Sequence, residues 1–340
     1  MTALFATAAF AQSTVTLSGQ VDAGLVNPIG ADKVRIDQSG NGANQIVFSG
    51  SEDLGAGMRA TFRLAQRFSP ESGLNDGTSG NRPLFQGETT LGLAGPFGTV
   101  RIGRALTALR GPIDNTDPWG TLQQASVAVV ATGYASSPDN VTYDPTSAAA
   151  GVAAVGSTGA GAGRIDGIHY ATPNFEGFTG ALTYAPKSTQ ITGVTTVGAK
   201  QFASLWLQYA GGPFVVGAGG EENRAGDRIT AAQASYDLGV VKVGATYGIV
   251  DAANTTRDRK SYNVGVTAPL GAFTLKAGFG RSRLEGAQAS VKKVGVGLDY
   301  ALSKRTLVYT SYGRDTGVSA TTGLSANPKS GYDLGVRHTF

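Results

Sequence analysis

The chain has 340 residues, no cysteine, two histidines and a formal net charge of +4. Without cysteine it cannot build a disulfide framework, and two isolated histidines, His169 and His338, supply neither a catalytic triad nor a His-rich zinc site. Charged residues make up 15% of the chain and form no basic stripe, which argues against nucleic-acid binding. No window approaches the run of about 18 apolar residues that a membrane-spanning helix needs.

Residues 1–11 are apolar and end in Ala9-Phe10-Ala11, the small-x-small pattern of a signal-peptidase site before Gln12. We interpret this stretch as the remnant of a signal peptide; the alternative is a frayed apolar N-terminus. Residues 12–340 are then expected to form a single exported barrel domain, because all-β barrels reach this length as one unit.

Period-two segments of about ten residues follow one another from Val15 to the end of the chain. In the stretch 58–68, for example, Met58, Phe62 and Leu64 alternate with Arg59 and Arg63. Such alternation predicts strands with one apolar and one polar face. A soluble strand buried on one face gives the same pattern, so the connections must separate the two interpretations.

The connections alternate between short turns and long polar stretches. The short ones carry the Gly, Pro, Asn or Asp that tight turns require, and they fall at 51–55, 95–98, 173–177, 211–213, 237–239, 269–271 and 302–305. The long ones cover 28–43, 69–84, 105–163, 187–198, 221–227, 252–260, 284–291 and 315–328. Seven short and eight long connections delimit sixteen strands.

The predicted fold class is therefore all-β, a 16-stranded antiparallel transmembrane β-barrel with short periplasmic turns and long extracellular loops. In lipid every backbone N–H and C=O must be paired within the protein, so a sheet can span the membrane only if it closes. With sixteen strands the side chains no longer fill the interior, and the lumen is an aqueous channel.

The third long stretch, 105–163, is unusual in length, and its Ala/Gly-rich part at 146–163 is typical of a flexible linker. A loop of this size is usually functional or disordered. We expect its earlier part to fold into the barrel.

The last segment, 329–340, places Tyr332, Leu334 and Val336 on one face and Asp333 and Arg337 on the other. As a terminal strand it would be an exposed edge unless it paired with the first strand at 15–25. This pairing would close the barrel.

At this point the sequence resembles the trimeric general porins of Gram-negative outer membranes, most closely the β-proteobacterial and neisserial-type branch. The resemblance is spread over residues 15–340. It is carried by VTLSGQVDAGL, GSEDLGAGMRATFRL, GPFGTVRIGR, YATPNFEGF, LSKRTLVY and the closing GYDLGVRHTF.

The resemblance implies a homotrimer in which the second loop, at 68–82, latches over a neighbour, and a third loop that forms the constriction. It implies outer-membrane lipid, lipopolysaccharide and the outer-membrane insertion machinery as partners, with Phe340 as the assembly signal. The chain departs from anion-selective relatives, in which basic residues commonly occupy the positions of Gln45 and of Gln86-Gly87-Glu88. Strong anion selectivity is therefore not carried over.

The candidate pore-constriction residues combine inward arginines with acidic residues that could face them. Strand parity nominates Arg59, Arg63, Arg67 and Arg101, with Arg104 and Arg164 on either side of the third loop. The acids are Asp114, Asp117 and Asp139 from that loop and Glu88 from the wall. A charged ring in a narrow passage selects ions by sign. Alternatively, the arginines merely solvate the wall or pair with nearby carboxylates.

The sequence favours a passive channel for ions and small hydrophilic solutes, weakly anion-preferring and without enzyme activity, metal or cofactor. The first alternative is a porin selective for one small anion or carboxylate. A non-channel surface β protein, such as an adhesin, would need a packed core that the polar strand faces do not supply.

Overall fold

The computed structural model describes residues 14–37, 41–74, 84–120, 124–130, 134, 163–186, 200–224, 226–253, 257–316 and 328–340. Asp139 and the stretch 146–162 lie outside these ranges. Within them the chain forms seventeen strands and one short helix, α1 (Arg110–Ile113). The strands are β1 (Thr14–Asn27), β2 (Arg35–Asp37), β3 (Gln45–Gly55), β4 (Met58–Arg67), β5 (Glu88–Gly95), β6 (Gly98–Leu106), β7 (Arg164–Ala171), β8 (Phe178–Ala185), β9 (Phe202–Gly211), β10 (Phe214–Glu222), β11 (Arg228–Asp237), β12 (Lys242–Asp251), β13 (Arg259–Leu270), β14 (Phe273–Leu284), β15 (Val291–Ala301), β16 (Thr306–Asp315) and β17 (Lys329–Thr339).

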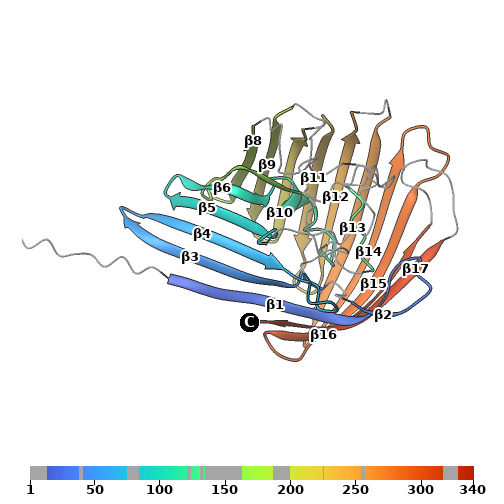
Figure 1. Ribbon diagram of the computed structural model, residues 1–340. Coiled ribbons are helices and arrows are strands. Elements are labelled where there is room, and N and C mark those ends of the chain that lie inside the picture. Colours follow the sequence, from blue (N-terminus) through green and yellow to red (C-terminus); the bar gives the residue numbers. More distant parts are fainter. Residues whose placement is uncertain are drawn as a thin grey trace, which may run out of the picture.

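All strands belong to one antiparallel sheet that closes on itself (Figure 1). Strand β1 pairs with β3 through residues 14–20 and with β17 through residues 20–27. The three-residue β2 lies in the first long connection, so the remaining sixteen strands form the barrel. The predicted sixteen-stranded barrel and its closure through the last strand are confirmed.

The strands show the predicted two faces. On β17, Tyr332, Leu334 and Val336 are exposed on the outer surface, whereas Asp333 between them is buried toward the interior. The same alternation of exposed and buried residues runs along β11, β12 and β15. An outward apolar band of this kind is what a barrel presents to lipid.

The first short turn is tighter than the sequence indicated. Strand β3 continues to Gly55, and the chain reverses at Ala56 and Gly57, whose φ angles are 51° and 76°. Two consecutive positive φ values are typical of a type I′ hairpin turn, whose twist matches that of the strands. The predicted turn residues 51–55 therefore all belong to β3.

The first long connection returns into the barrel. Nη1 of Arg337 donates hydrogen bonds to both the carbonyl oxygen and Oδ1 of Asn41, each 2.7 Å long. Nδ2 of Asn41 donates to Oδ1 of Asp299 at 3.3 Å. Because Arg337 and Asp299 lie near the short-turn ends of β17 and β15, this segment reaches deep into the lumen.

No helix in the described ranges is long and apolar enough to cross a membrane.

Candidate functional site

The third long connection enters the barrel directly after β6. Strand register places Thr183 of β8 beside Ser204 of β9, both on the inner face. The hydroxyl of Thr183 accepts a hydrogen bond from N–H of Ala108, and that of Ser204 accepts one from N–H of Leu109, each 3.0 Å long. These bonds satisfy loop backbone donors and fix the point where the loop leaves the wall.

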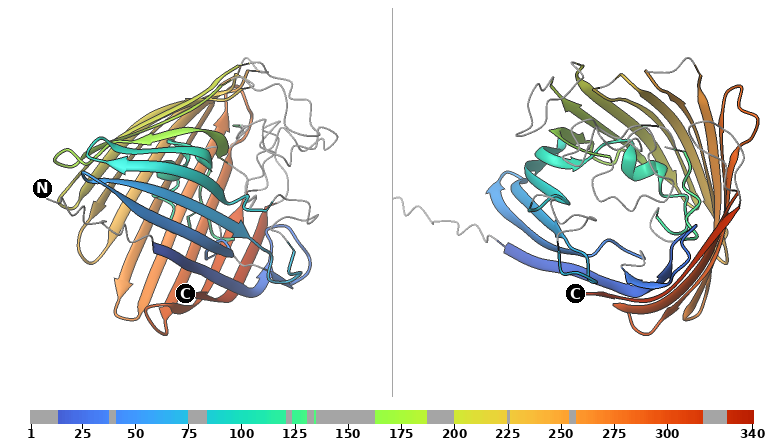
Figure 2. Two further views of the ribbon diagram at one scale, coloured as in Figure 1. Left: turned by 60° about the vertical axis from the view of Figure 1, so that its left-hand side comes forward. Right: turned by 45° about the vertical axis from the view of Figure 1, so that its right-hand side comes forward.

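The helix α1 follows and packs on an apolar patch of the inner wall. Leu109 and Ile113 form a buried cluster with Trp206, Ile229 and Val250 from β9, β11 and β12. Figure 2 shows this teal segment inside the ring of strands. Farther along the loop, the hydroxyl of Tyr134 donates to Oε1 of Glu221 on β10 at 2.9 Å. This part of the loop therefore shares a buried apolar core with the inner wall.

Beyond α1 the loop lies across β12 and β13. The hydroxyl of Thr116 is hydrogen-bonded to that of Thr246, and Nδ2 of Asn263 donates to Oγ1 of Thr116 at 2.9 Å. Asp117 is buried within the loop, where its carboxylate accepts hydrogen bonds from Oγ of Ser126 at 2.7 Å and from N–H of Val127 at 3.3 Å. Asp117 thus holds two parts of the loop together.

A track of wall glycines receives the loop. Its members are Gly265 on β13, Gly278 and Gly280 on β14, Gly295 and Gly297 on β15, and Gly313 on β16. A β-carbon at any of them would overlap loop atoms, which belong to Thr116, Pro118, Trp119, Gln124, Ala125 and Val127. Only residues without a side chain allow the loop backbone to approach the wall this closely.

The described loop reaches β17 at Gln124 and then turns back, since Val127 faces Gly280 on β14 and Tyr134 bonds Glu221 on β10. N–H of Gln124 donates to Oδ2 of Asp333 at 3.2 Å, while Oε1 of Gln124 accepts a hydrogen bond from N–H of Ile29 at 2.9 Å. The loop therefore follows the inner wall from β8 to β17. The wall of β3 to β7, which carries all six predicted arginines, lies on the other side of the lumen (Figure 2).

On that wall three charged residues meet. Nε of Arg63 lies 2.9 Å from Oε2 of Glu88, and Nη1 of Arg101 lies 2.6 Å from Oε1 of the same carboxylate. Thr90 also donates to Glu88 at 3.2 Å. The side chains of Arg63 and Arg101 nevertheless stay 42% and 37% exposed, whereas that of Glu88 is 17% exposed. Glu88 thus lies beside the arginines, and the group presents two guanidiniums against one carboxylate.

Two further candidate arginines donate hydrogen bonds to backbone carbonyl oxygens. Nε of Arg104 donates to the carbonyl oxygen of Gln86 at 3.1 Å, and Nε of Arg164 donates to that of Gly87. Arg67 and Arg104 are electrostatic neighbours of Arg164, so the long-loop end of this wall is strongly basic. These side chains fix the segment that leads from the second loop into β5.

The remaining candidates are spread over the site. Arg59 is exposed next to the first short turn, opposite Asp53 in the strand register. Asp114 ends α1 and forms an ion pair of 3.2 Å with Arg110. Burial raises the pKa of Asp114 to about 6; Arg110 opposes this shift and Asp117 adds to it. The charge of Asp114 therefore changes near neutral pH.

Sequence reasoning missed the inward path of the first loop and its contact residues. Asn41 and Arg337 are 296 positions apart, so no local signal joins them. Lys276 on β14 forms an ion pair of 2.7 Å with Asp299 and belongs to the same part of the wall. Alternation placed Arg337 on the inner face and could have placed Lys276 and Asp299 there too, but it could not place any of them beside a loop.

Within the described ranges, no group of three or more His, Asp or Glu side chains is placed to hold a metal ion. His169 is buried, and its ring nitrogens contact Oγ1 of Thr183 and the carbonyl oxygen of Gly103, each at 3.1 Å. Both nitrogens are used to join β6, β7 and β8.

Comparisons with known proteins agree on one family. The family model described as Gram-negative porin matches residues 1–319. Outer membrane porin protein 32 of Delftia acidovorans is 27% identical over 98% of this chain and 96% of its own length. Among solved structures, the anion-selective porin from Comamonas acidovorans has a TM-score of 0.76 at 22% identity, over 97% of this chain and 100% of its own. OmpT of Vibrio cholerae in its trimer form has a TM-score of 0.66 at 16% identity, over 96% and 99% of the two chains.

Proposed function

The chain belongs to the Gram-negative porin family and is an outer-membrane β-barrel channel, and we propose that it conducts ions and small hydrophilic solutes passively with a weak preference for anions. Members of this family are porin channels. The proposed mechanism is diffusion through a charged, water-filled passage, and it includes no catalytic step, cofactor or energy input.

The group formed by Arg63, Glu88 and Arg101 is the observation that carries the preference for anions. Each guanidinium keeps part of its surface exposed on the lumen side while sharing the Glu88 carboxylate, so the group has a net positive charge. A positive wall in a narrow passage raises the local anion concentration. Because Glu88 cancels part of that charge, the preference is weak.

The acidic residues of the third loop contribute less to an electric field across the lumen than their number suggests. Asp114 shares its charge with Arg110, and Asp117 is used within the loop. Asp139 lies outside the described ranges and stays a candidate. We propose that the constriction lies between the wall group at Arg63 and the third loop. Arg59, Arg104 and Arg164 extend its positive field along the wall.

The experiment is a reversal-potential measurement across planar bilayers in a dilute KCl gradient. Near 10 mM salt the Debye length is about 30 Å, so wall charges are poorly screened. A unit charge about 8 Å from a permeating ion in water changes its energy by about 0.5 kcal/mol, or roughly twofold in local concentration. Because the charge acts in opposite directions on chloride and potassium, Arg63→Gln and Arg101→Gln should each lower the chloride-to-potassium permeability ratio by roughly fivefold.

Glu88→Gln supplies the matched control because it removes charge of the opposite sign from the same group. It should raise the chloride-to-potassium ratio. If all three substitutions leave the reversal potential unchanged, the wall group does not set selectivity. The purified protein should also give large ohmic conductance steps, and a barrel that never conducts would contradict the channel itself.

A second candidate function is selective passage of one small carboxylate or similar anion. The paired guanidiniums favour it, since arginine binds carboxylates in a bidentate manner. Such a solute should reduce chloride current at low concentration in the wild-type protein and not in Arg63→Gln.

We also propose that the channel assembles as a homotrimer, in line with the trimer form of OmpT. The second loop, proposed to latch over a neighbour, lies largely outside the described ranges.

A further inference from the structure

Residues 41–44 of the first long connection, which we term the inner segment, cross the inner face of the wall. One end of the segment is bound to β1, where Nδ2 of Asn44 donates to the carbonyl oxygen of Asp22 at 2.9 Å. Gln20, also on β1, donates from Nε2 to the carbonyl oxygen of Ala43 at 2.8 Å. Both hydrogen bonds tie this end of the segment to the first strand.

The other end of the inner segment is held by strands farther along the wall. Nη1 of Arg337 on β17 donates to both acceptors of Asn41, and Nδ2 of Asn41 donates to Asp299 on β15. Neighbouring strands lie about 4.8 Å apart, so the three spacings from β1 to β15 amount to about 14 Å. The inner segment and its hydrogen bonds therefore span β1, β17, β16 and β15.

The inner segment covers charged wall residues that an open lumen would leave hydrated. Lys276 on β14 and Asp299 form an ion pair of 2.7 Å, and their side chains are only 11% and 14% exposed. On the opposite wall, the side chains of Arg63 and Arg101 stay 42% and 37% exposed. The contrast indicates that the segment fills lumen space beside Lys276 and Asp299. Asn41 itself is half-buried, so part of its surface faces the remaining passage.

The inner segment and the third loop lie at different depths on the same wall. On β14 the third loop contacts Gly278, and Lys276 is the next inward residue toward the short turn. On β17 the third loop contacts Asp333, and Arg337 lies four residues, or about 13 Å, nearer the short-turn end. The order is the same on β15. The lumen is therefore narrowed a second time, on the short-turn side of the third loop.

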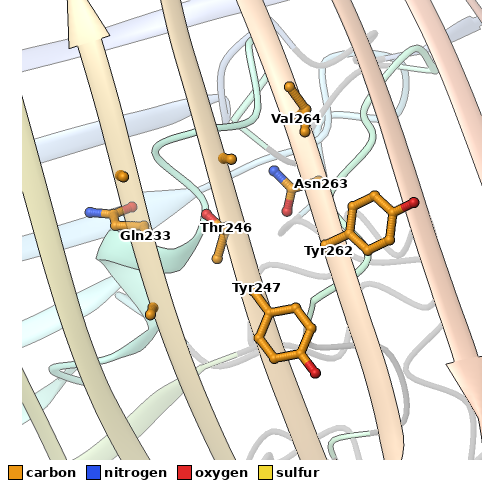
Figure 3. Close-up of a pocket in the computed structure, with 9 residues that line it drawn as sticks. Gln233, Thr246, Tyr247, Tyr262, Asn263 and Val264 are labelled. Atoms are coloured by element: carbon orange, nitrogen blue, oxygen red, sulfur yellow. The ribbon is translucent and has the colours of Figure 1, made fainter.

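The two loops have separate supports on the wall. Farther round the barrel, the third loop is held through Thr116 by Thr246 of β12 and Asn263 of β13, whose side chains point inward from the sheet (Figure 3). The hydrogen bonds of the inner segment are made on β1, β15 and β17 instead. The bond between Ile29 and Gln124 joins the two loops outside the inner segment. Loss of the inner segment's bonds should therefore leave the third loop in place.

The charges beside the inner segment balance. Lys276 and Arg337 are positive, whereas Asp299 and Asp22, the register partner of Arg337, are negative, so the formal charges of these four side chains sum to zero. The segment itself, Asn-Gly-Ala-Asn, is uncharged. This part of the passage should therefore act on the size of a solute and not on the sign of its charge.

We propose that the inner segment is a second size filter of the channel and that Arg337 is the residue that positions it. Nη1 of Arg337 binds both the carbonyl oxygen and Oδ1 of Asn41, which fixes the backbone and the side chain of Asn41 together. None of the ion pairs in the described ranges includes Arg337. The inference rests on the proposed channel function and concerns the size of the admitted solutes.

The test measures how large a neutral polymer can enter the conducting channel. Poly(ethylene glycol) of graded size is added to one chamber of a planar bilayer at a time, and single-channel conductance reports whether each size enters that end of the barrel. We expect Arg337→Gln to raise the size limit from one chamber only, the one that the short turns face, because the third loop keeps its own supports. Arg337→Lys should restore part of the wild-type limit, since a single donor nitrogen makes both bonds to Asn41.

Arg305→Gln is the matched control, because it removes the same charge from an exposed residue of the last short turn and should keep both size limits. The inference is overturned if Arg337→Gln shifts neither limit or shifts both equally. If that variant does not fold, Asn41→Ala decides, because it removes Oδ1 and Nδ2 and leaves the wall intact. Its limit must rise from the same chamber, and an unchanged limit overturns the inference. A conducting barrel with unchanged limits contradicts this inference alone, whereas a barrel that never conducts contradicts the proposed function.

Discussion

Asp114 shows how a single side chain can couple the channel to pH. It ends α1 inside the lumen, and burial raises its pKa to about 6 while Arg110 pairs with its carboxylate. A carboxyl with this pKa is mostly ionised at pH 7 and mostly neutral at pH 5. Its protonation removes a negative charge and leaves the guanidinium of Arg110 without its partner.

We therefore expect the preference for anions to rise as the pH falls through about 6. The loss of one negative charge acts in the same direction as the gain of one positive charge on the wall. Because it acts in opposite directions on chloride and potassium, roughly a fivefold change in the chloride-to-potassium permeability ratio is expected from Coulomb's law at about 8 Å. Reversal potentials recorded between pH 5 and pH 8 in dilute KCl measure this change.

Asp114→Asn should give the low-pH permeability ratio at every pH in that range, because its side chain cannot ionise. Asp53→Asn, which alters an exposed carboxylate at the first short turn, should keep the wild-type pH profile. A profile that persists in Asp114→Asn would assign the pH dependence to another group.

At the scale of elements, the third loop and the inner wall fit each other because the wall lacks side chains where the loop lies. The six glycines of the track are distributed over β13 to β16, and each faces loop atoms. The hydroxyls of Thr183, Ser204 and Thr246 then provide the hydrogen bonds that water would otherwise make. The loop is thus held by shape and by hydrogen bonds along its described length.

Adding a side chain to the glycine track should displace the loop. Gly295→Val places a branched side chain against the carbonyl group of Ala125, and overpacking of this kind typically costs about 1–3 kcal/mol. We expect the barrel to fold, because its strands are unaffected, and single-channel recordings to show altered and more variable conductance.

A glycine outside the track serves as the control for this substitution. A β-carbon added at Gly220 on β10 would meet no heavy atom nearer than 3.4 Å, so Gly220→Val should leave single-channel conductance unchanged. Equal conductance in Gly295→Val and the wild type would mean that the position of the loop does not depend on its contact with Gly295.

The strands of the barrel could be predicted from the sequence, whereas the contacts of the loops inside it could not. Period-two alternation and turn residues were sufficient for the sixteen strands and for the closing pair of β1 and β17, since both signals are local. The pairing of Glu88 with Arg63 and Arg101 depends on the register between strands, which fixes the side chains that become neighbours. The positions of Gln124 and Asn41 are fixed by hydrogen bonds to wall residues 209 and 296 positions away. Alternation along a single strand cannot predict such distant contacts.

At the scale of the whole molecule, β1 joins the two ends of the sheet. Its first half pairs with β3 and its second half with β17, so both edges of the sheet are covered by one strand. Phe340 completes the seam: its N–H donates to the carbonyl oxygen of Gly19 at 3.0 Å, and its own carbonyl oxygen accepts from N–H of Gly19 at 3.1 Å. Its ring covers the same glycine, where a side chain would overlap it.

Deleting Phe340 should therefore impair assembly more than conduction. The two backbone hydrogen bonds contribute about 1 kcal/mol each, and their loss leaves Gly19 unpaired at the lipid boundary, where an unsatisfied backbone group is especially unfavourable. The lumen groups at Arg63 and Arg101 are unaffected, so channels that do form should have wild-type conductance. The yield of heat-modifiable barrel in outer-membrane fractions measures assembly, and bilayer recording measures conduction. Phe340→Tyr, which keeps the backbone and an aromatic ring, should restore the yield; a normal yield after the deletion would show that assembly does not require this residue.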